Sequence, residues 1–267
     1  MPRKRAELPV RMQEGFAFVP ASIGDTPVTL LLDTGAQGML LTPHIVEALH
    51  LPVDLHGGTR MLGTGGVRNA SNVTLRRLKV GGVPMADGSV PVAVLPGVPK
   101  TEPPLAGLLG NQFLGTYDLD LDVPHGRMAL YDALGCPTPP FPLPYSTLRL
   151  LLSPDGDAFV TVQVNGESLL ALVDTGSRAS IITEQAAERL GLGGPGSANL
   201  ARGVDGSTLP IRHLRVRTLQ VGTDVTTDAP ISVSPLQLGR GDMLLGLDYL
   251  GRHRVWISHR TGRVLIQ

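Results

Sequence analysis

The chain has 267 residues, 23 basic and 23 acidic side chains, and a pI near 7.1. Its length allows one large domain or two ordinary ones. A neutral chain without a basic, aromatic-rich patch is not expected to bind nucleic acid. Because no apolar run approaches the roughly 20 residues of a membrane helix, we expect no membrane segment. Cys136 is the only cysteine, which excludes an internal disulfide.

The first half is typical of short strands separated by Gly, Pro and Asp turns. Asp33-Thr34-Gly35 follows the apolar run VTLLL. Residues 43–51 then place apolar side chains at helical spacing, with Thr42 as the N-cap and Pro43 in the first turn. A second short helix is expected near 111–115. The predicted strands cover residues 16–23, 28–32, 72–80, 90–95, 117–123 and 127–131.

Residues 135–144 read GCPTPPFPLP. Proline removes backbone donors and fixes φ, so this stretch cannot lie inside a sheet. We expect a semi-extended linker over 135–145, with domains over 1–134 and 146–267.

The second half repeats the pattern. Asp174-Thr175-Gly176 follows LLALV, and a helix is expected after it, with Thr183 as N-cap and Gly191 as C-cap. A further short helix is expected near 247–251. The predicted strands cover residues 158–164, 169–173, 209–221, 229–234, 254–259 and 263–267.

The two halves align without a gap from residue 15 to the first Asp-Thr-Gly at an offset of 141 residues, which falls to 136 at the later Leu-Leu-Gly motifs. A period above one hundred residues indicates duplicated domains, because solenoid repeats run at roughly 20 to 50 residues. We predict an all-β fold of two similar lobes, each a small closed barrel-like sheet with one or two short helices. Each lobe carries one Asp-Thr-Gly, and two carboxylates brought together in a cleft make a proton-sharing acid/base pair.

The two triplets, the glycine-rich hairpins and the Leu-Leu-Gly motifs resemble an aspartic protease of the retropepsin/pepsin type, close to bacterial retropepsin-like aspartyl proteases, with two fused retropepsin-like domains. The segment LLGNQFLGTYDLDLDVPHGRMALYD adds to the resemblance. It implies that Asp33 and Asp174 are catalytic, lie about 3 Å apart and share a proton, as this enzyme class does. One would activate a water at mildly acidic pH to hydrolyse a peptide bond, without a metal, a cofactor or a covalent intermediate.

The resemblance also assigns supporting roles around the two carboxylates. Thr34 and Thr175 would tie the Asp loops together across a pseudo-twofold axis. Gly35 and Gly176 would let the backbone turn sharply and bring amides near the carboxylates. Ala36 and Ser177 come next, and the Ser177 hydroxyl could hydrogen-bond its own Asp. The Leu-Leu-Gly segments would pack beside the Asp loops.

Glycine-rich hairpins in both halves are interpreted as flaps that close over an extended peptide or protein substrate. Neither tip has the tyrosine of pepsin-type flaps, which favours retropepsin-like ones. The chain would act as a monomer with an internal pseudo-dimer. Interlobe contacts are expected from strands near 127–131 and 263–267, with those near 8–12 and 148–152. The flap residues are Gly63, Thr64, Gly65 and Gly66, and Gly203, Val204, Asp205 and Gly206.

Other interpretations stay open. A catalytically silent peptide-binding or sensing module could use the same fold, and a β-protein without a cleft would keep the carboxylates apart. Trp256 is expected in the core of a strand, and the alternating Asp118, Asp120 and Asp122 form the polar face of a strand. The first residues lack the roughly 7–15-residue apolar region of a signal peptide. The compartment is left open: cytoplasmic as given, periplasmic or secreted if a leader was removed.

Overall fold

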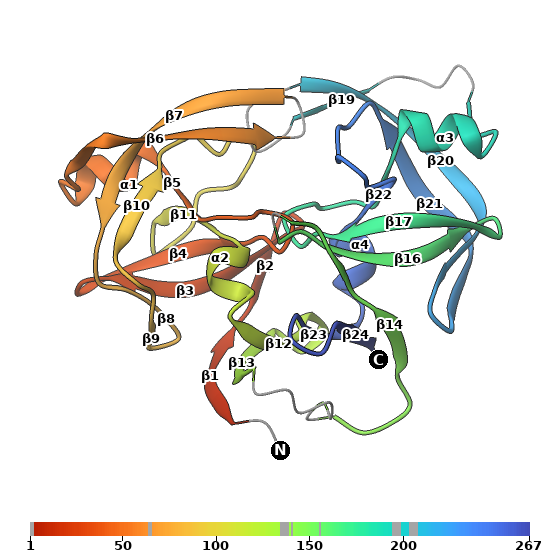
Figure 1. Ribbon diagram of the computed structural model, residues 1–267, viewed down its shortest axis with the longest axis horizontal. Helices are drawn as coiled ribbons and strands as arrows, with labels where there is room; N and C mark the ends of the chain where they lie inside the picture. Colours follow the sequence, from red (N-terminus) through yellow and green to blue (C-terminus); the bar gives the residue numbers. More distant parts are fainter. Residues whose placement is uncertain are drawn as a thin grey trace.

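The architecture comes from a computed structural model. It describes residues 3–63, 66–133, 139, 141–154, 156–193, 199–202 and 208–267. Strands dominate, and the described residues form only four short α-helices and one 3-10 turn. The predicted all-β, two-lobed class is therefore confirmed. The two lobes lie side by side, with both chain ends on the same edge of the molecule (Figure 1).

The N-terminal lobe contains thirteen strands and two helices among its described residues. These are β1 (Lys4–Pro9), β2 (Arg11–Gln13), β3 (Phe16–Ile23), β4 (Thr26–Leu32), β5 (Leu40–Leu41), α1 (Pro43–Ala48), β6 (Val53–Gly63), β7 (Gly66–Leu75), β8 (Leu78–Val80), β9 (Val83–Pro84), β10 (Gly88–Pro91), β11 (Leu105–Leu109), α2 (Asn111–Leu114), β12 (Tyr117–Asp122) and β13 (Arg127–Asp132), with the 3-10 turn η1 (Val123–His125) before β13.

The C-terminal lobe repeats most of this order. Its elements are β14 (Ser146–Arg149), β15 (Leu151–Leu152), β16 (Ala158–Val164), β17 (Glu167–Val173), β18 (Ile181–Thr183), α3 (Glu184–Arg189), β19 (Asn199–Arg202), β20 (Thr208–Val221), β21 (Asp224–Ser234), β22 (Met243–Leu245), α4 (Leu247–Leu250), β23 (Arg254–Ser258) and β24 (Arg263–Ile266).

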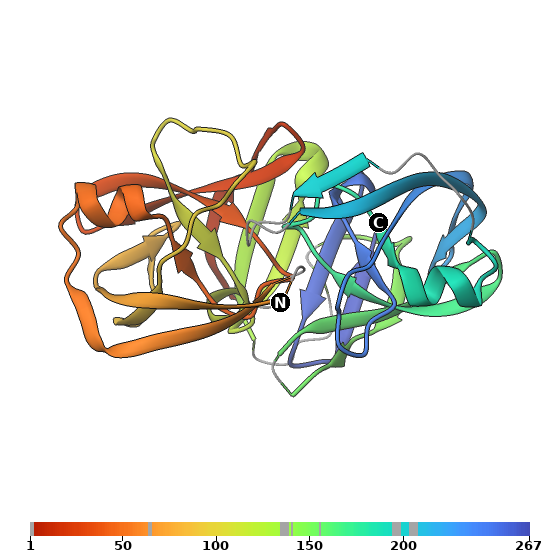
Figure 2. The same cartoon turned by 90° about the horizontal axis from the view of Figure 1, so that it is seen from above.

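The sheets show the duplication in space. In each lobe the strand that leads into the Asp-Thr-Gly lies parallel to the Leu-Leu-Gly strand, β4 beside β11 and β17 beside β22. The Leu-Leu-Gly strand also pairs antiparallel with the short strand before the helix, β5 or β18. In the C-terminal lobe β16 pairs with both β17 and β20, which closes the sheet. Viewed from above, the two lobes stand at opposite ends of the molecule (Figure 2).

A six-stranded sheet, counted over the described residues, joins the lobes in the order β1-β13-β12-β23-β24-β14. The pair that crosses between lobes is β12–β23, in which Asp120 lies opposite Trp256. The predicted contact strands near 127–131 and 263–267 belong to this sheet, but they pair within their own lobes, as do β1 and β14. That prediction is correct only in part: Tyr131 of β13 contacts Trp256 of the other lobe, but the backbone pairing between the lobes is made by YDLDLD and RVWIS at the centre of the sheet.

One hydrophobic core runs through both lobes. Leu119 and Leu121 of β12 enter it from one lobe, and Val255 and Ile257 of β23 enter it from the other. The remaining positions of the crossing strands face the opposite side of the sheet, since side chains alternate along a strand. There Trp256 is buried, as predicted, against Tyr131 and Phe141 of the Pro-rich segment. Residues 134–138 and 140 lie outside the described part, so the predicted domain boundaries stay a prediction.

The three alternating aspartates face the same side as Trp256, but they are buried (Asp118, 0% exposed; Asp120, 1%; Asp122, 3%). The three carboxyl groups thus share one polar face of the strand, as predicted, but other residues cover this face. Burial raises the pKa of Asp118. Asp120 instead accepts two hydrogen bonds from the Arg254 guanidinium of the other lobe, at 2.8 and 2.6 Å.

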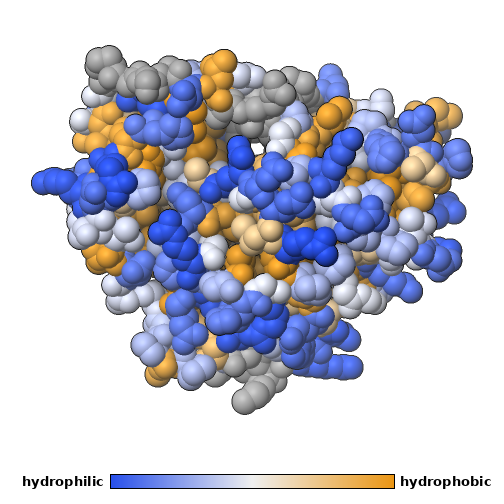
Figure 3. Space-filling view, turned by 180° about the vertical axis from the view of Figure 1, so that it is seen from behind, coloured by the Kyte–Doolittle hydropathy of each residue, from blue (hydrophilic) through white to orange (hydrophobic). Residues whose placement is uncertain are grey.

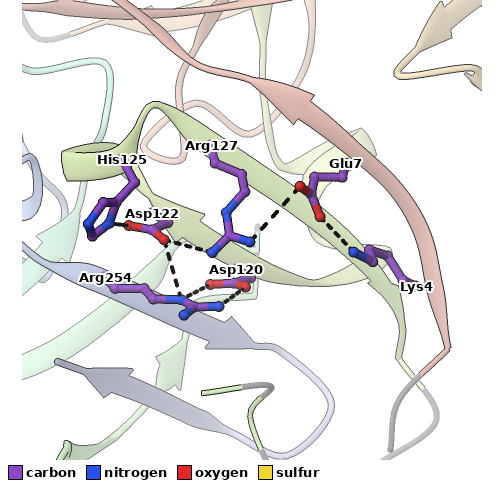
Figure 4. Close-up of polar contacts among 7 residues, drawn as sticks. All are labelled: Lys4, Glu7, Asp120, Asp122, His125, Arg127 and Arg254. Carbon is purple, nitrogen blue, oxygen red and sulfur yellow. Dashed lines mark hydrogen bonds and ion pairs between the residues drawn. The ribbon is translucent and has the colours of Figure 1, made fainter. Parts of the chain in front are cut away.

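Charged side chains extend this contact across the outer face of the sheet (Figure 4). Asp122 accepts hydrogen bonds from Arg127 and His125, at 2.7 and 2.6 Å, and lies 3.8 Å from Arg254. Burial opposes ionisation of Asp122, but the hydrogen bonds from Arg127 and His125 outweigh it, so its pKa is lowered. The Arg254 guanidinium also lies 4.6 Å from the centre of the Phe141 ring. Arg254 thus joins the second lobe to two buried carboxylates of the first.

The predicted helices are confirmed as α1, α2, α3 and α4, but their caps differ. Thr183 accepts a hydrogen bond from the Ala186 amide, whereas the Thr42 hydroxyl donates to the carbonyl of Leu105 instead. Gly191 follows the C-cap of α3 in a left-handed conformation, with φ +66°. The predicted strand 72–80 is split between β7 and β8, because Arg77 adopts φ +57° between them.

Replacing Arg254 by Met leaves Asp120 and Asp122 buried without their interlobe partner. We expect the free energy of unfolding to fall by about 3 kcal/mol, because an uncompensated buried charge is costly. The measurement is urea unfolding at pH 7. Arg77→Met is the matched control: its ion pair with Asp25 is 67% and 93% exposed, and we expect a change of about 0.5 kcal/mol or less. Equal effects of the two substitutions would contradict this role of Arg254.

Candidate active site

The two Asp-Thr-Gly loops meet between the lobes. Asp33 directly follows β4, and its amide donates to the carbonyl of Leu109 in β11, at 3.1 Å. Asp174 follows β17, and its amide donates to the carbonyl of Leu245 in β22, at 3.0 Å. Each aspartate therefore sits at the end of a pair of parallel, buried strands, which fixes its backbone in its own lobe.

Thr34 and Thr175 join the two loops by four hydrogen bonds. The Thr34 hydroxyl accepts from the Thr175 amide (3.1 Å) and donates to the carbonyl of Val173 (2.7 Å). The Thr175 hydroxyl reciprocates, accepting from the Thr34 amide (3.0 Å) and donating to the carbonyl of Leu32 (2.9 Å). Both threonines are buried, at 1% and 0% exposed. These bonds are shielded from water and hold the backbones of the two lobes in contact.

The glycines of the triplets give each carboxyl group room beside the opposite loop. A Cβ on Gly35 would lie 2.5 Å from Cγ of Asp174, and a Cβ on Gly176 would lie 2.4 Å from Cγ of Asp33. Any side chain at either position would therefore collide with the opposite carboxyl group. Neither glycine has a positive φ, so close approach, rather than the sharp turn expected from the sequence, requires them.

Backbone amides point at both carboxylates. Oδ1 of Asp33 accepts hydrogen bonds from the amides of Gly35 and Ala36, at 3.0 and 2.9 Å. Oδ1 of Asp174 accepts a bond of 2.8 Å from the amide of Gly176. The Ser177 hydroxyl does not reach Asp174, contrary to the sequence-based expectation: it donates to the carbonyl of Ala179, at 2.8 Å. The amides of Gly176 and Ser177 also act to lower the pKa of Asp174, so backbone amides favour the anion of both groups.

The two carboxyl groups are buried and hydrogen-bonded to each other, Asp33 being 5% and Asp174 9% exposed. Burial raises the pKa of Asp33 to about 6, although the amides of Ala36 and Gly35 act against it. Burial and the neighbouring charge of Asp33 raise the pKa of Asp174 well above its ordinary value. The pair therefore retains a proton at a pH where an exposed aspartate has lost it.

The Leu-Leu-Gly segments lie against the Asp loops, as the resemblance implied. A Cβ on Gly110 would lie 2.1 Å from the carbonyl oxygen of Gly38, and one on Gly246 would lie 2.5 Å from the carbonyl group of Ala179. Sequence reasoning missed Asn111, whose Nδ2 donates to the carbonyl of Thr34 at 2.8 Å. The available signal was a polar residue after the Leu-Leu-Gly of the first half, where the second half has Leu.

The predicted flaps correspond to two hairpins on the side of the molecule opposite the interlobe sheet (Figure 1). In the first half, Gly63 pairs with Gly66 at the ends of β6 and β7, and Thr64 and Gly65 between them lie outside the described residues. In the second half, β19 and β20 pair in the same way. Gly203, Val204, Asp205 and Gly206 lie outside the described part of the chain.

A pocket of about 470 Å³ opens beside the two carboxyl groups. Its lining includes Phe16 from β3, Ile181 from β18, Leu209 from β20 and the exposed Arg178. Seen from behind, apolar side chains gather where the lobes meet, with hydrophilic ones around them (Figure 3). The pocket joins the acid pair to a surface on which the side chain of a ligand could bind.

Within the described residues, no group of three or more His, Cys, Asp or Glu side chains is placed to hold a metal ion. No helix in the same part of the chain is both long and apolar enough to span a membrane.

Comparison with known proteins agrees with this geometry. A family of gag-polyprotein putative aspartyl proteases matches residues 160–252, and a family of aspartyl proteases matches residues 19–113. The fold and the paired Asp-Thr-Gly loops thus define a two-lobed aspartic protease architecture. The chain belongs to the retropepsin-like aspartyl proteases, with one such domain in each half.

Individual relatives match part of the chain. DNA damage-inducible protein 1 of Yarrowia lipolytica is 32% identical over 111 residues, 40% of this chain and 27% of that protein. Protein DDI1 homolog 2 of Homo sapiens gives the same values. The aligned part thus spans about a quarter of these relatives. Basic 7S globulin from soybean shares the fold, with a TM-score of 0.55 at 11% identity over 100% of this chain and 95% of that one. The bacterial affiliation expected from the sequence stays a prediction.

The raised pKa values predict how stability depends on pH. The folded protein keeps the Asp33 proton up to about pH 6, whereas an unfolded chain releases it near pH 4. Stability should therefore fall as pH rises between these values. Asn at position 33 cannot ionise, so Asp33→Asn should not lose stability as pH rises. We expect its free energy of unfolding at pH 7 to exceed that of wild type by on the order of 3 kcal/mol.

The measurement is urea unfolding of wild type and Asp33→Asn from pH 4 to pH 8, where the gain should shrink towards pH 4. Asp25→Asn is the control, because that carboxylate is 93% exposed and should show no such trend. A gain for Asp33→Asn that stays constant over this range would be inconsistent with a proton held by the buried pair.

Proposed function

We propose that the chain is an aspartic endopeptidase that hydrolyses peptide bonds with a water activated between Asp33 and Asp174. One observation carries the proposal: a buried, hydrogen-bonded pair of carboxyl groups, one from each lobe, with raised pKa values, opens onto a pocket. The matches of both halves to aspartyl protease families support proteolysis in general.

In this proposal Asp33, whose pKa is about 6, is the base and Asp174, whose pKa the charge of Asp33 raises, is the acid. Asp33 accepts two backbone amides and is the group that ionises first. As the base, it takes a proton from the water while the water oxygen attacks the peptide carbonyl carbon. Asp174, whose pKa is raised further, donates its proton to the carbonyl oxygen. The C–N bond then breaks as Asp33 returns a proton to the leaving nitrogen and Asp174 recovers one from the hydroxyl oxygen.

The same proposal covers the substrate and the active unit. An extended peptide would lie in the cleft under the β6–β7 and β19–β20 hairpins, bound through its main chain. Since both carboxyl groups come from one chain and are joined by Thr34 and Thr175, a single chain would suffice for activity.

Replacing either aspartate by Asn should abolish cleavage, because one variant lacks the base and the other lacks the acid. We expect a loss of about a thousandfold or more for Asp33→Asn and for Asp174→Asn, measured by mass spectrometry of a digested peptide library. Asp25→Asn, an exposed carboxylate outside the cleft, should cleave like wild type. Activity retained in either cleft variant would falsify the shared-pair mechanism. A wild type that binds peptides but cleaves none would favour the silent binding module.

The acidic limb of the pH profile should lie near pH 6. The working pair carries one proton, and burial holds the first ionisation, that of Asp33, at about 6. Below this pH both carboxyl groups are protonated and the base is lost, so kcat/KM should fall about tenfold per pH unit. The measurement is kcat/KM on one cleaved peptide from pH 3 to pH 9. A rate that stays flat down to pH 4 would show that the pair ionises like exposed carboxylates.

A further inference from the structure

The pocket beside the acid pair is asymmetric, although the chain is a repeat. Its apolar side chains come mainly from the C-terminal lobe: Ile181, Leu209, Ile211, Leu236 and Leu244. From the N-terminal lobe, the aromatic side chain of Phe16 joins the lining. Among the described lining residues, a side chain bound in this pocket would therefore contact chiefly the C-terminal lobe.

The two halves differ at a position beside this pocket. In the N-terminal lobe Phe16 packs with Phe18, Leu31, Leu40 and Leu108, and all five are buried. The position 141 residues later is Asp157, a charged residue that cannot cover an apolar surface. Its neighbouring cluster contains Phe159, Leu172 and Leu244, with Ile181 and Leu236 only partly buried. Two partly buried members of this cluster, Ile181 and Leu236, line the pocket and can contact a ligand there.

The rim of this pocket is basic. Arg178 and His213 line it, and the only acidic side chains in its described lining are Asp33 and Asp174. Arg178 has an exposed guanidinium 5.0 Å from the centre of the Phe16 ring, and it forms no ion pair with a described residue. A Cβ added at Gly15 would lie 3.1 Å from its Cδ, so the stem lies against the other lobe. The guanidinium is therefore held across the cleft while its donors stay available.

We propose that this pocket selects peptides in which a large apolar residue lies within two positions of an acidic one. The apolar side chain occupies the surface formed by Ile181, Leu236 and Leu244. The carboxylate binds Arg178, because guanidinium offers paired donors that match a carboxylate. The inference rests on the proposed function, since it assigns the specificity of the same cleft. The equivalent position in the first half is Gln37, which is neutral, so the preference applies to one side of the cleft.

The test uses pairs of fluorescently labelled decapeptides that contain one Phe or Leu and, within two positions, either Glu or Gln. With wild type, we expect kcat/KM for Glu peptides to exceed that for Gln peptides by about fivefold, the upper range for a partly exposed ion pair. The ratio should approach one in 1 M salt, where charge interactions are screened within roughly 3 Å. Changing the Phe or Leu to Ala should lower kcat/KM for both members of a pair.

Arg178→Gln, which introduces the residue found at the equivalent position 37, should reduce the Glu-to-Gln ratio to about one. Arg76→Gln is the matched control, because Arg76 is exposed and does not line the pocket; its ratio should equal that of wild type. A purely structural role of Arg178 between the lobes would lower both rates equally and leave the ratio unchanged. That result, or a wild-type ratio of one, would overturn the inference.

Affinity measurements on an inactive variant distinguish a failure of this inference from a failure of the proposed function. Fluorescence anisotropy with the Asp33→Asn protein measures the affinity of the same peptide pairs without hydrolysis. Tighter binding of Glu peptides, lost in the Asp33→Asn, Arg178→Gln double variant, would support the selectivity even if wild type cleaved nothing. Cleavage by wild type without a Glu preference in rate or affinity would support the protease and reject the selectivity. Failure of both kinds of peptide to bind would reject the selectivity as well.

Discussion

The contact between two buried carboxyl groups is the constraint on which this structure depends. Bringing Asp33 and Asp174 together out of water is unfavourable, as their raised pKa values show. The reciprocal hydrogen bonds of Thr34 and Thr175 hold the loops in contact, and Gly35 and Gly176 leave the space that the carboxyl groups need. Burial of the two carboxyl groups therefore lowers the stability of the fold at the proposed active site, as is expected of functional sites.

The interlobe sheet is a second connection between the lobes. In this sheet the sequences of the two repeats differ. At the 136-residue offset of the later motifs, Arg254 and Ser258 of β23 correspond to Asp118 and Asp122 of β12. Arg254 lies opposite Asp122 in the sheet and binds Asp120 through two hydrogen bonds. Two identical copies of β12 would instead place buried carboxylates against each other, which is unfavourable. The charges of the two strands therefore favour pairing of unlike lobes within one chain.

Divergence between the halves also shapes the cleft. The aromatic Phe16 of the first half corresponds to Asp157 in the second, and the change from Gln37 to Arg178 adds a cation to the pocket lining. The residues that make the pair of carboxyl groups are the same in both halves, whereas the residues around them differ. The proposed chemistry and the proposed selectivity therefore rest on separate sets of side chains, so that one could change without the other.

Much of this could be predicted from the sequence, because local patterns determine local structure. Alternating apolar runs defined the strands, the two Asp-Thr-Gly triplets marked the loops, and the offset of 141 residues indicated two similar lobes. Only the tertiary structure decided that β12 and β23 form the interlobe pair, that Asp118, Asp120 and Asp122 are buried, and that Ser177 turns away from Asp174. The first two outcomes depend on which surfaces meet across the lobes, whereas the Ser177 hydroxyl finds a local partner, the carbonyl of Ala179. Neither strand period nor residue type specifies the partner that a side chain finds more than a hundred residues away.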